Sequence, residues 1–178
     1  MAERTFIIHI SGYWRDQHKT DIRKSSGIYF VYESHFSEID QHVDLLKLIY
    51  IGEAENIRAR ILDHERYPSW LTCVSPGNEL CYAYAPVDTF YRERVKAAFV
   101  HMHKPPANPV PDGPFLYDKT TLISTGRTAL VNPVITMRKN TAAFPETAMF
   151  RQRLEMIPVR TVQVFNQIVP VRRYAVGE

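Results

Sequence analysis

Two short apolar runs, residues 27–32 and 45–51, place the strongest constraint on how this chain folds. Both are rich in Ile, Val, Tyr and Phe and are bracketed by glycine and polar residues, which is the pattern of paired β-strands. After the second run the spacing of the apolar residues changes, and Ile57 and Ile61 stand four residues apart. This spacing predicts a helix that packs one apolar stripe against the sheet.

The neighbouring stripe of this helix carries Asn56, Arg60 and His64, which are also four residues apart. Residues at this spacing share one helix face. The sequence therefore predicts an amide, a cation and an imidazole in one file, beside strands that carry Tyr29 and Tyr50.

Two further elements follow along the chain. Alternating apolar and aromatic residues over 79–85 predict a third strand. A second helix is expected from about Asp88, an acceptable N-cap residue, to His103. It ends before Pro105, because proline removes a backbone donor and disfavours a helical residue before it. Glu93 lies off the predicted core stripe. That stripe comprises Tyr91, Val95, Ala98, Phe99 and Met102.

Other segments carry weaker patterns. Residues 6–10 predict a short N-terminal strand, ended by Ser11-Gly12 and followed by a polar connector.

Residues 33–46 form an acidic insertion between the tyrosine strands, with no Lys or Arg before Lys47. Because acidic side chains repel phosphate, its tip is expected to lie away from DNA or to contact a partner. Tyr67-Pro68 is expected to interrupt secondary structure, and Trp70 and Leu71 are expected to pack at the edge of the core and close it.

The segment after residue 109 predicts further strands and one helix. Strand-like runs occur at 121–124, at 130–131 with 134–137, and at 159–165. A short helix over about 146–156 follows Pro145, which suits a first-turn proline.

Composition narrows the class of protein. The chain has 178 residues, 45% of them hydrophobic and 23% charged, as in ordinary globular proteins. Two cysteines are too few for a disulfide framework. No apolar run approaches the roughly 18–20 residues that cross a membrane, and no signal core follows a basic N-terminus. We therefore expect no membrane partner and a cytoplasmic location.

Positive charge is concentrated after residue 108. Residues 1–108 hold 13 Lys and Arg against 14 Asp and Glu, a balance of −1, whereas residues 109–178 hold 9 against 5, a balance of +4. A basic extension beside a near-neutral core can supply phosphate contacts. The alternative is that these charges form an ordinary solvated surface.

Six features stand in order along the chain. They are the tripeptides Gly27-Ile28-Tyr29 and Tyr50-Ile51-Gly52, and the residues Arg60, His64, Glu93 and Asn108. Each tripeptide alone would be weak evidence, since three-residue matches are common by chance. Together the six features resemble the GIY-YIG nucleases over roughly residues 26–109. The interval between the two tyrosines is longer than the family's usual short hairpin, which is the main departure.

The resemblance implies catalytic roles for six residues: Tyr29, Tyr50, Arg60, His64, Glu93 and Asn108. Glu93 is implied as the only protein carboxylate on a single Mg²⁺ (or Mn²⁺), with water and a phosphate oxygen completing the coordination, as is usual for Mg²⁺. Arg60 is suited to hold the phosphate and offset transition-state charge. Tyr29 is the candidate general base, and Tyr50 is expected to orient the water or a phosphate oxygen. The two tyrosines can also exchange these roles.

His64 and Asn108 are expected to support the reacting groups. His64 polarises or orients a tyrosine in this interpretation, and a purely structural role is the alternative. Asn108 braces the loop beside Glu93, or is simply a turn residue before Pro109.

The predicted fold is α+β: a small, mostly antiparallel sheet flanked by helices, with an N-terminal strand and a C-terminal elaboration. We divide the chain into an N-terminal extension (1–25), a GIY-YIG-type nuclease core (26–109) and a basic C-terminal elaboration packed on that core (110–178). Candidate DNA contacts are Arg58, Lys104, Arg127, Arg138 and Lys139.

These inferences predict a divalent-metal-dependent endonuclease that hydrolyses DNA phosphodiester bonds by a tyrosine-assisted, single-metal mechanism. One alternative is an inactive nucleic-acid-binding module with this fold, and another is a nuclease or phosphodiesterase acting on RNA or a nucleotide. The sequence leaves open the recognition sequence, the biological pathway and the oligomeric state, for which a homodimer is one option.

Overall fold

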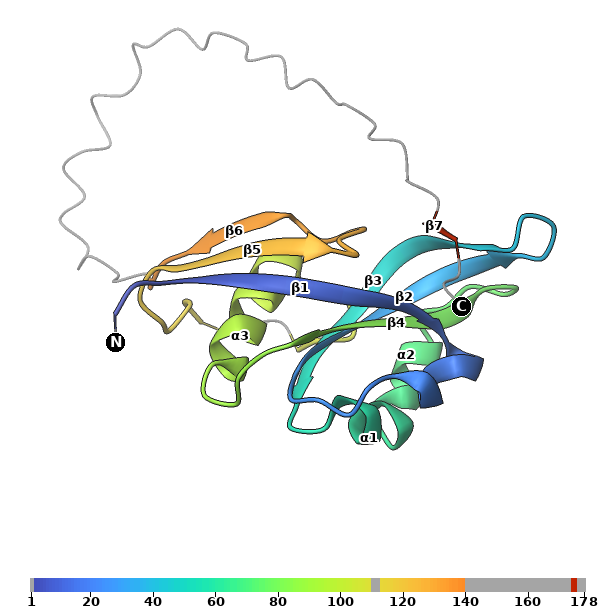
Figure 1. The fold of residues 1–178 in the computed structure, drawn as a ribbon, viewed down its shortest axis with the longest axis horizontal. Coiled ribbons are helices and arrows are strands. Elements are labelled where there is room, and N and C mark those ends of the chain that lie inside the picture. Colours follow the sequence, from blue (N-terminus) through green and yellow to red (C-terminus); the bar gives the residue numbers. More distant parts are fainter. Residues whose placement is uncertain (1, 110–112, 140–173, 176–178) are drawn as a thin grey trace, which may run out of the picture.

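The computed structural model describes residues 2–109, 113–139 and 174–175. Six strands within residues 4–137 and one two-residue strand form a single mixed sheet, with the order β6-β5-β1-β4-β2-β3-β7 (Figure 1). The strands are β1 (Arg4–Arg15), β2 (Gly27–Ser37), β3 (His42–Ala54), β4 (Glu79–Pro86), β5 (Thr120–Gly126), β6 (Val134–Met137) and β7 (Tyr174–Ala175). The helices are the 3₁₀ helix η1 (Asp16–Asp21) and the α-helices α1 (Ile57–Leu62), α2 (Tyr67–Leu71) and α3 (Arg92–His103).

All strand pairs are antiparallel except β1 with β5, which is parallel. The expectation of an α+β fold with a mostly antiparallel sheet is therefore confirmed at this level. The expected hairpin of β2 and β3 and the expected third strand, β4, are also present.

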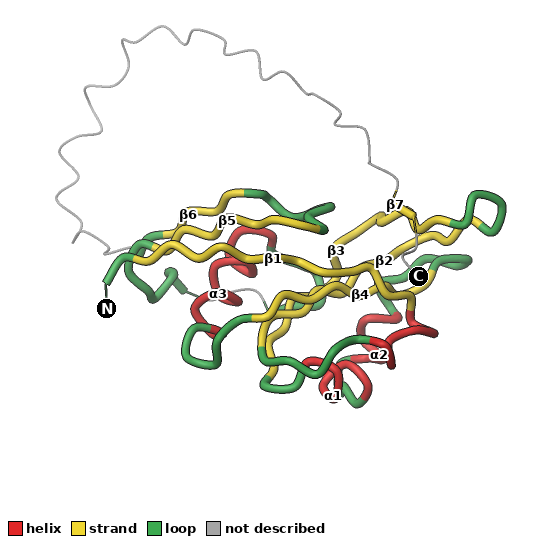
Figure 2. Tube along the Cα trace, in the orientation of Figure 1, coloured by secondary structure: helices red, strands yellow, loops and turns green. Residues whose placement is uncertain are grey.

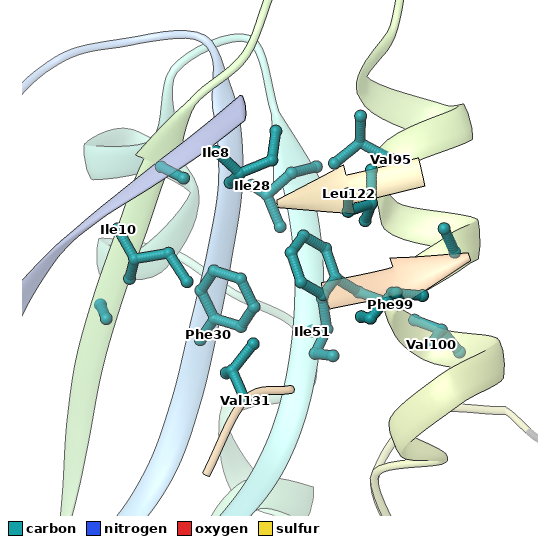
Figure 3. Packing of buried hydrophobic residues seen from close by; sticks show 14 of the residues in the cluster. Ile8, Ile10, Ile28, Phe30, Ile51, Val95, Phe99, Val100, Leu122 and Val131 are labelled. Carbon is teal, nitrogen blue, oxygen red and sulfur yellow. The ribbon is translucent and has the colours of Figure 1, made fainter. Parts of the chain in front are cut away.

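The alternation of side chains along β2 divides the core between the two faces of the sheet. Ile28 and Phe30 join a cluster that includes Val95 and Phe99 of α3 (Figure 3). Tyr29 and the other intervening side chains join a second cluster with residues from α1 and α2. Because successive strand residues point to opposite faces, α3 covers one face while α1 and α2 cover the other (Figure 2).

The interval 33–46, predicted as an acidic insertion between strands that end at residue 32 and begin at residue 45, is itself mostly strand. β2 continues to Ser37 and β3 begins at His42, so only residues 38–41 form the turn. Glu33 is 6% exposed, and its Oε1 accepts hydrogen bonds from Ser75 N at 2.9 Å and Asn78 Nδ2 at 2.7 Å. The tip of the hairpin extends away from α1 (Figure 1).

β1 is longer than the predicted strand, and Gly12 does not end it. A Cβ at Gly12 would lie 2.9 Å from that of Ala83, so glycine permits the close approach of β4. The strand continues to Arg15, and Trp14 pairs with Tyr82 after a register shift. The sheet therefore incorporates residues that were expected in a polar connector.

α1 is shorter than the predicted helical stripe. Asn56 is its N-cap, with Oδ1 accepting a hydrogen bond from Ala59 N at 3.1 Å, and the helix ends at Leu62. His64 therefore lies beyond the helix, and the prediction of one file of three side chains was wrong for it. Pro68 lies in the first turn of α2 instead of interrupting secondary structure, since proline fits the first helical turn.

Trp70 is fully buried in α2, as predicted, but Leu71 is 48% exposed. Consecutive helix residues face different directions, so only one of this pair can reach the core. Cys81 is buried, whereas Cys73 is partly exposed.

α3 begins later than predicted. The Asp88 carboxylate accepts a hydrogen bond from Phe90 N at 2.8 Å and the Asp88 carbonyl accepts one from Tyr91 N at 2.9 Å, so this residue closes a separate turn before the helix. Met102 is 38% exposed and Val100 is buried in its place. The buried residues of α3 are Arg94, Val95, Ala98, Phe99 and Val100.

Two of the predicted C-terminal strands are present as β5 and β6. Leu130 has a φ of 60° and lies in a turn, which corrects its assignment to a strand. The predicted helix at 146–156 and the run at 159–165 lie outside the described residues. Within the described ranges, no helix combines the length and apolarity that crossing a bilayer requires.

Glu33 should make folding stability depend on pH. Burial acts to raise the pKa of Glu33, but the hydrogen bonds from Asn78 and Ser75 outweigh it, and the net pKa lies below its ordinary value. The unfolded chain therefore binds a proton more readily, and this contribution to stability is lost as pH falls below about 4.5. The free energy of unfolding, measured in urea from about pH 7 to about pH 3, should decrease less steeply with falling pH for Glu33→Gln than for the wild type. The same exchange at the exposed turn residue Glu38 is the control, and parallel curves for Glu33→Gln and the wild type would contradict the assignment.

Candidate functional site

The two glycine-tyrosine tripeptides meet through a direct contact across β2 and β3. Tyr29 pairs with Gly52, and its ring lies so close that a Cβ at Gly52 would fall 2.0 Å from Cζ. Gly27 is also required for space, since a Cβ there would lie 2.1 Å from the Ala85 carbonyl oxygen. Both glycines therefore allow a close approach that any side chain would prevent.

A hydrogen-bonded chain fixes the protonation of His64. Its Nδ1 accepts a hydrogen bond from the backbone N–H of Arg66 at 3.0 Å, and its Nε2 lies 2.7 Å from Tyr29 Oη. Because Nδ1 accepts, neutral His64 carries its proton on Nε2. His64 therefore donates to Tyr29, and the phenolic proton of Tyr29 must point elsewhere.

Burial dominates the titration of these three rings. Desolvation raises the pKa of Tyr29, and the negative charge of an ionised Tyr50 raises it further, whereas Arg60 lowers it. Burial also raises the pKa of Tyr50. For His64, burial and the nearby Arg60 lower the pKa to about 4. Near neutral pH the ring is uncharged and the phenols are protonated.

A hollow of about 550 Å³ opens beside this cluster, at the outer edge of β3. α1 and the loop after it approach from one side, and α3 approaches from the other. Tyr50 lines the hollow, whereas Tyr29 is 1% exposed and lies behind it. The lining includes Tyr50, Glu53, Arg60, Glu65, Arg66, Glu93, Lys96 and Asn108.

Asn108 braces the edge of β3. Its Oδ1 accepts a hydrogen bond from Ile51 N at 2.8 Å, and its Nδ2 donates to the Ile51 carbonyl at 2.9 Å. Ala107 N also donates to the Ile49 carbonyl at 3.0 Å. The turn after α3 thereby satisfies backbone groups that an edge strand would otherwise leave unpaired.

Two of the arginines at the site are already paired with carboxylates. Arg60 Nη2 lies 2.7 Å from Glu65 Oε1, and Arg92 Nε lies 3.6 Å from Glu53 Oε2. In the described part of the chain no ion pair engages Glu93, whose side chain is exposed to the hollow.

The donor set fits a hard divalent ion held largely by water. No group of three or more His, Cys, Asp or Glu side chains that could hold a metal occurs among the described residues. Glu93 supplies one free carboxylate, and Glu53 supplies a second one in the same hollow. One or two carboxylates with several waters are the usual environment of Mg²⁺.

The sequence-predicted site residues therefore fall into two groups. Tyr50, Arg60, Glu93 and Asn108 line one hollow, and Tyr29 and His64 lie directly behind Tyr50, with ring centroids 6.0 and 5.6 Å from it. None of the predicted DNA contacts lines this hollow. Arg58 lies in α1, Lys104 caps α3, and Arg127, Arg138 and Lys139 follow β5 and β6.

Four lining residues with acidic, Arg or Lys side chains were not predicted as site residues from the sequence: Glu53, Glu65, Arg66 and Lys96. Lys96 lies three residues after Glu93 and therefore on the same face of α3, a spacing that could have identified it. Glu65 and Arg66 follow the end of α1, where no periodic pattern applies.

A scan against protein-family models, a comparison with curated proteins and a comparison with solved structures each find no match for this chain.

Gly52→Ala should displace the Tyr29 ring, because the new methyl group would overlap it. Overpacking of this kind typically costs about 1–3 kcal/mol, so we expect lower stability by that amount in chemical unfolding. Gly113→Ala is the matched control, since a Cβ there meets nothing within 4 Å. Equal stability of the two variants would contradict the close contact.

His64 should remain neutral at physiological pH. With a folded pKa of about 4 against 6.5 in the unfolded chain, the unfolded state binds the extra proton first, so stability falls as pH drops through this window. NMR titration should show the His64 ring protons shifting only near pH 4. A His64 midpoint near 6.5 would contradict the buried hydrogen-bonded arrangement.

Proposed function

We propose that this protein is a divalent-metal-dependent endonuclease that hydrolyses phosphodiester bonds in DNA, with the fold and active site of the GIY-YIG nucleases. One observation carries the proposal: Tyr50, Arg60, Glu93 and Asn108, which are distant in sequence, line one hollow with Tyr29 and His64 directly behind. Phosphodiester hydrolysis needs a positioned water, a base, and positive charge on the phosphoryl oxygens.

Glu93 is the residue that would hold Mg²⁺ or Mn²⁺, supported by its free carboxylate in the hollow. When bound, such an ion polarises a phosphoryl oxygen and stabilises the charge on the leaving oxygen. Glu53 is held by Arg92 at 3.6 Å, so it can contribute through bound water. Asn108 keeps the β3 edge in place beside these carboxylates.

Arg60 binds the scissile phosphate in this proposal. Its planar guanidinium can form two parallel hydrogen bonds to phosphate oxygens. Its exposed pairing with Glu65 supports this role, because the guanidinium already binds an anionic group at the edge of the hollow.

The two tyrosines act as a unit that takes the proton of the attacking water. A neutral phenol cannot accept this proton, so the base is the phenolate, formed when the phenol releases its own proton to solvent. Burial raises the pKa of Tyr29 and opposes this ionisation, whereas the positive charge of Arg60 favours it. Tyr50 lines the hollow and contacts the water. Tyr29, the base expected from sequence, lies behind Tyr50 and receives the Nε2–H of His64, a hydrogen bond that stabilises negative charge on its oxygen.

The proposal predicts Mg²⁺-dependent cleavage of DNA by the purified protein. Plasmid, branched DNA, single-stranded DNA and RNA of matched sequence are incubated with Mg²⁺ or with EDTA. We expect cleavage only with Mg²⁺, and a rate loss of about 100-fold or more for Glu93→Gln. Glu38→Gln, the same exchange at the far turn of the β2–β3 hairpin, should retain full activity.

The products distinguish the remaining alternatives. A discrete fragment ladder from plasmid favours a sequence-specific enzyme, whereas preference for branched DNA favours a structure-selective one. Salt-dependent binding without hydrolysis would indicate a nucleic-acid-binding module in place of a nuclease. Preferential cleavage of RNA would indicate that RNA is the substrate. Undiminished cleavage by Glu93→Gln would exclude the proposed metal ligand.

A further inference from the structure

Two cations face the hollow without a carboxylate partner. Lys96 projects from α3, and Arg66 lies in the loop after α1. Among the described residues no ion pair engages either of them, in contrast to Arg60 and Arg92. Their positive charge is therefore available to an anion in the hollow.

Both cations line the hollow that contains the proposed reacting position. Glu93, Lys96, Val100 and His101 line the hollow in sequence along α3, so it extends about 12 Å along the helix from Glu93. Arg66 directly follows Glu65, which pairs with Arg60. A strand that enters at Arg60 and Glu93 and follows α3 would next meet Lys96, and Arg66 lines the same hollow.

The opposite side of Arg60 has a different electrostatic character. A second hollow there shares Arg60 and Glu53 with the first, and carries Glu55 and Asp63 as well. The second hollow is lined by three carboxylates and two cations, a balance of −1, because its only cation besides Arg60 is Arg92, which is paired with Glu53. The first hollow is lined by three carboxylates and three cations, a balance of 0, so it repels a phosphate less. The favourable path for a polyanion is therefore along α3.

We propose that Arg66 and Lys96 form a binding subsite for a second backbone phosphate, adjacent to the scissile one, so that the protein acts on polynucleotide strands in preference to small phosphodiesters. The inference rests on the proposed function for the position of the scissile phosphate. The subsite also makes substrate binding asymmetric, since it requires a bound phosphate on only one side of the cleaved bond.

The experiment compares Arg66→Gln and Lys96→Gln with Lys24→Gln, an equal charge change that lines neither hollow. Binding of a labelled single-stranded oligonucleotide is followed by anisotropy in EDTA over a range of salt. Loss of one phosphate contact should lower the slope of log K against log salt by about 1. We expect this for Arg66→Gln and Lys96→Gln but not for Lys24→Gln, with equal thermal unfolding of all variants.

Cleavage then separates the subsite from the reacting centre. For the oligonucleotide, Arg66→Gln and Lys96→Gln should raise KM about fivefold or more with kcat unchanged, and hydrolysis of bis(4-nitrophenyl) phosphate should match the wild type. Unchanged salt slopes in both variants would overturn the subsite. An equal loss on both substrates would also overturn it, because the residues would then act at the reacting phosphate.

The two proposals can fail separately. If the wild type cleaves neither substrate but the variants show reduced salt slopes, the phosphate subsite stands and the nuclease assignment fails. If the wild type cleaves DNA and both variants match it in slope and KM, the nuclease assignment stands and the subsite fails.

Discussion

The packing of the Tyr29 ring against Gly52 determines where the other groups of the candidate site lie. Because Gly52 has no side chain, the ring lies against the β3 backbone and its oxygen reaches His64 at 2.7 Å. His64 in turn is held by the backbone N–H of Arg66. One close contact between strands thus fixes the chain after α1, including the segment that pairs with Arg60 and lines the hollow.

The second requirement is that α3 be held against the same edge of β3. Asn108 attaches the turn after α3 to Ile51 by two hydrogen bonds. At the other end of the helix, Arg94 is 4% exposed and donates to Thr120 Oγ1 and to the carbonyls of Ala2, Asp118 and Lys119. The N-terminal segment and the start of β5 therefore anchor the helical turn that carries Glu93, which gives these additions to the core a structural role in the site.

The sequence was most informative where local pattern and tertiary packing agree. The strand pair around Tyr29 and Tyr50, the third strand and the end of α3 were all predicted, because alternation and proline act locally. His64 was misplaced because periodicity continued past a helix end that tertiary contacts impose. The strands were predicted to stop at residue 32 and to begin again at residue 45 because the interval between them is acidic, whereas Glu33 is buried and accepts hydrogen bonds from residues 75 and 78 that no local pattern reveals. Convergence on one hollow depends on how β3, α3 and the segment after α1 pack together, which no local pattern specifies.

In the proposed function, the pairing of Arg60 with Glu65 would keep the guanidinium ready for a phosphate. The Glu65 side chain is 61% exposed and the Arg60 side chain 40% exposed, and ion pairs so open to solvent contribute little to stability. A phosphate entering the hollow would replace this weak pair with a bidentate, charge-assisted contact, while Glu65 returns to water. In the proposed function, Glu65 thus holds Arg60 close to the phosphate position, and the phosphate can displace it. Burial, by contrast, keeps Tyr29 and His64 uncharged until a ligand changes the charge around them.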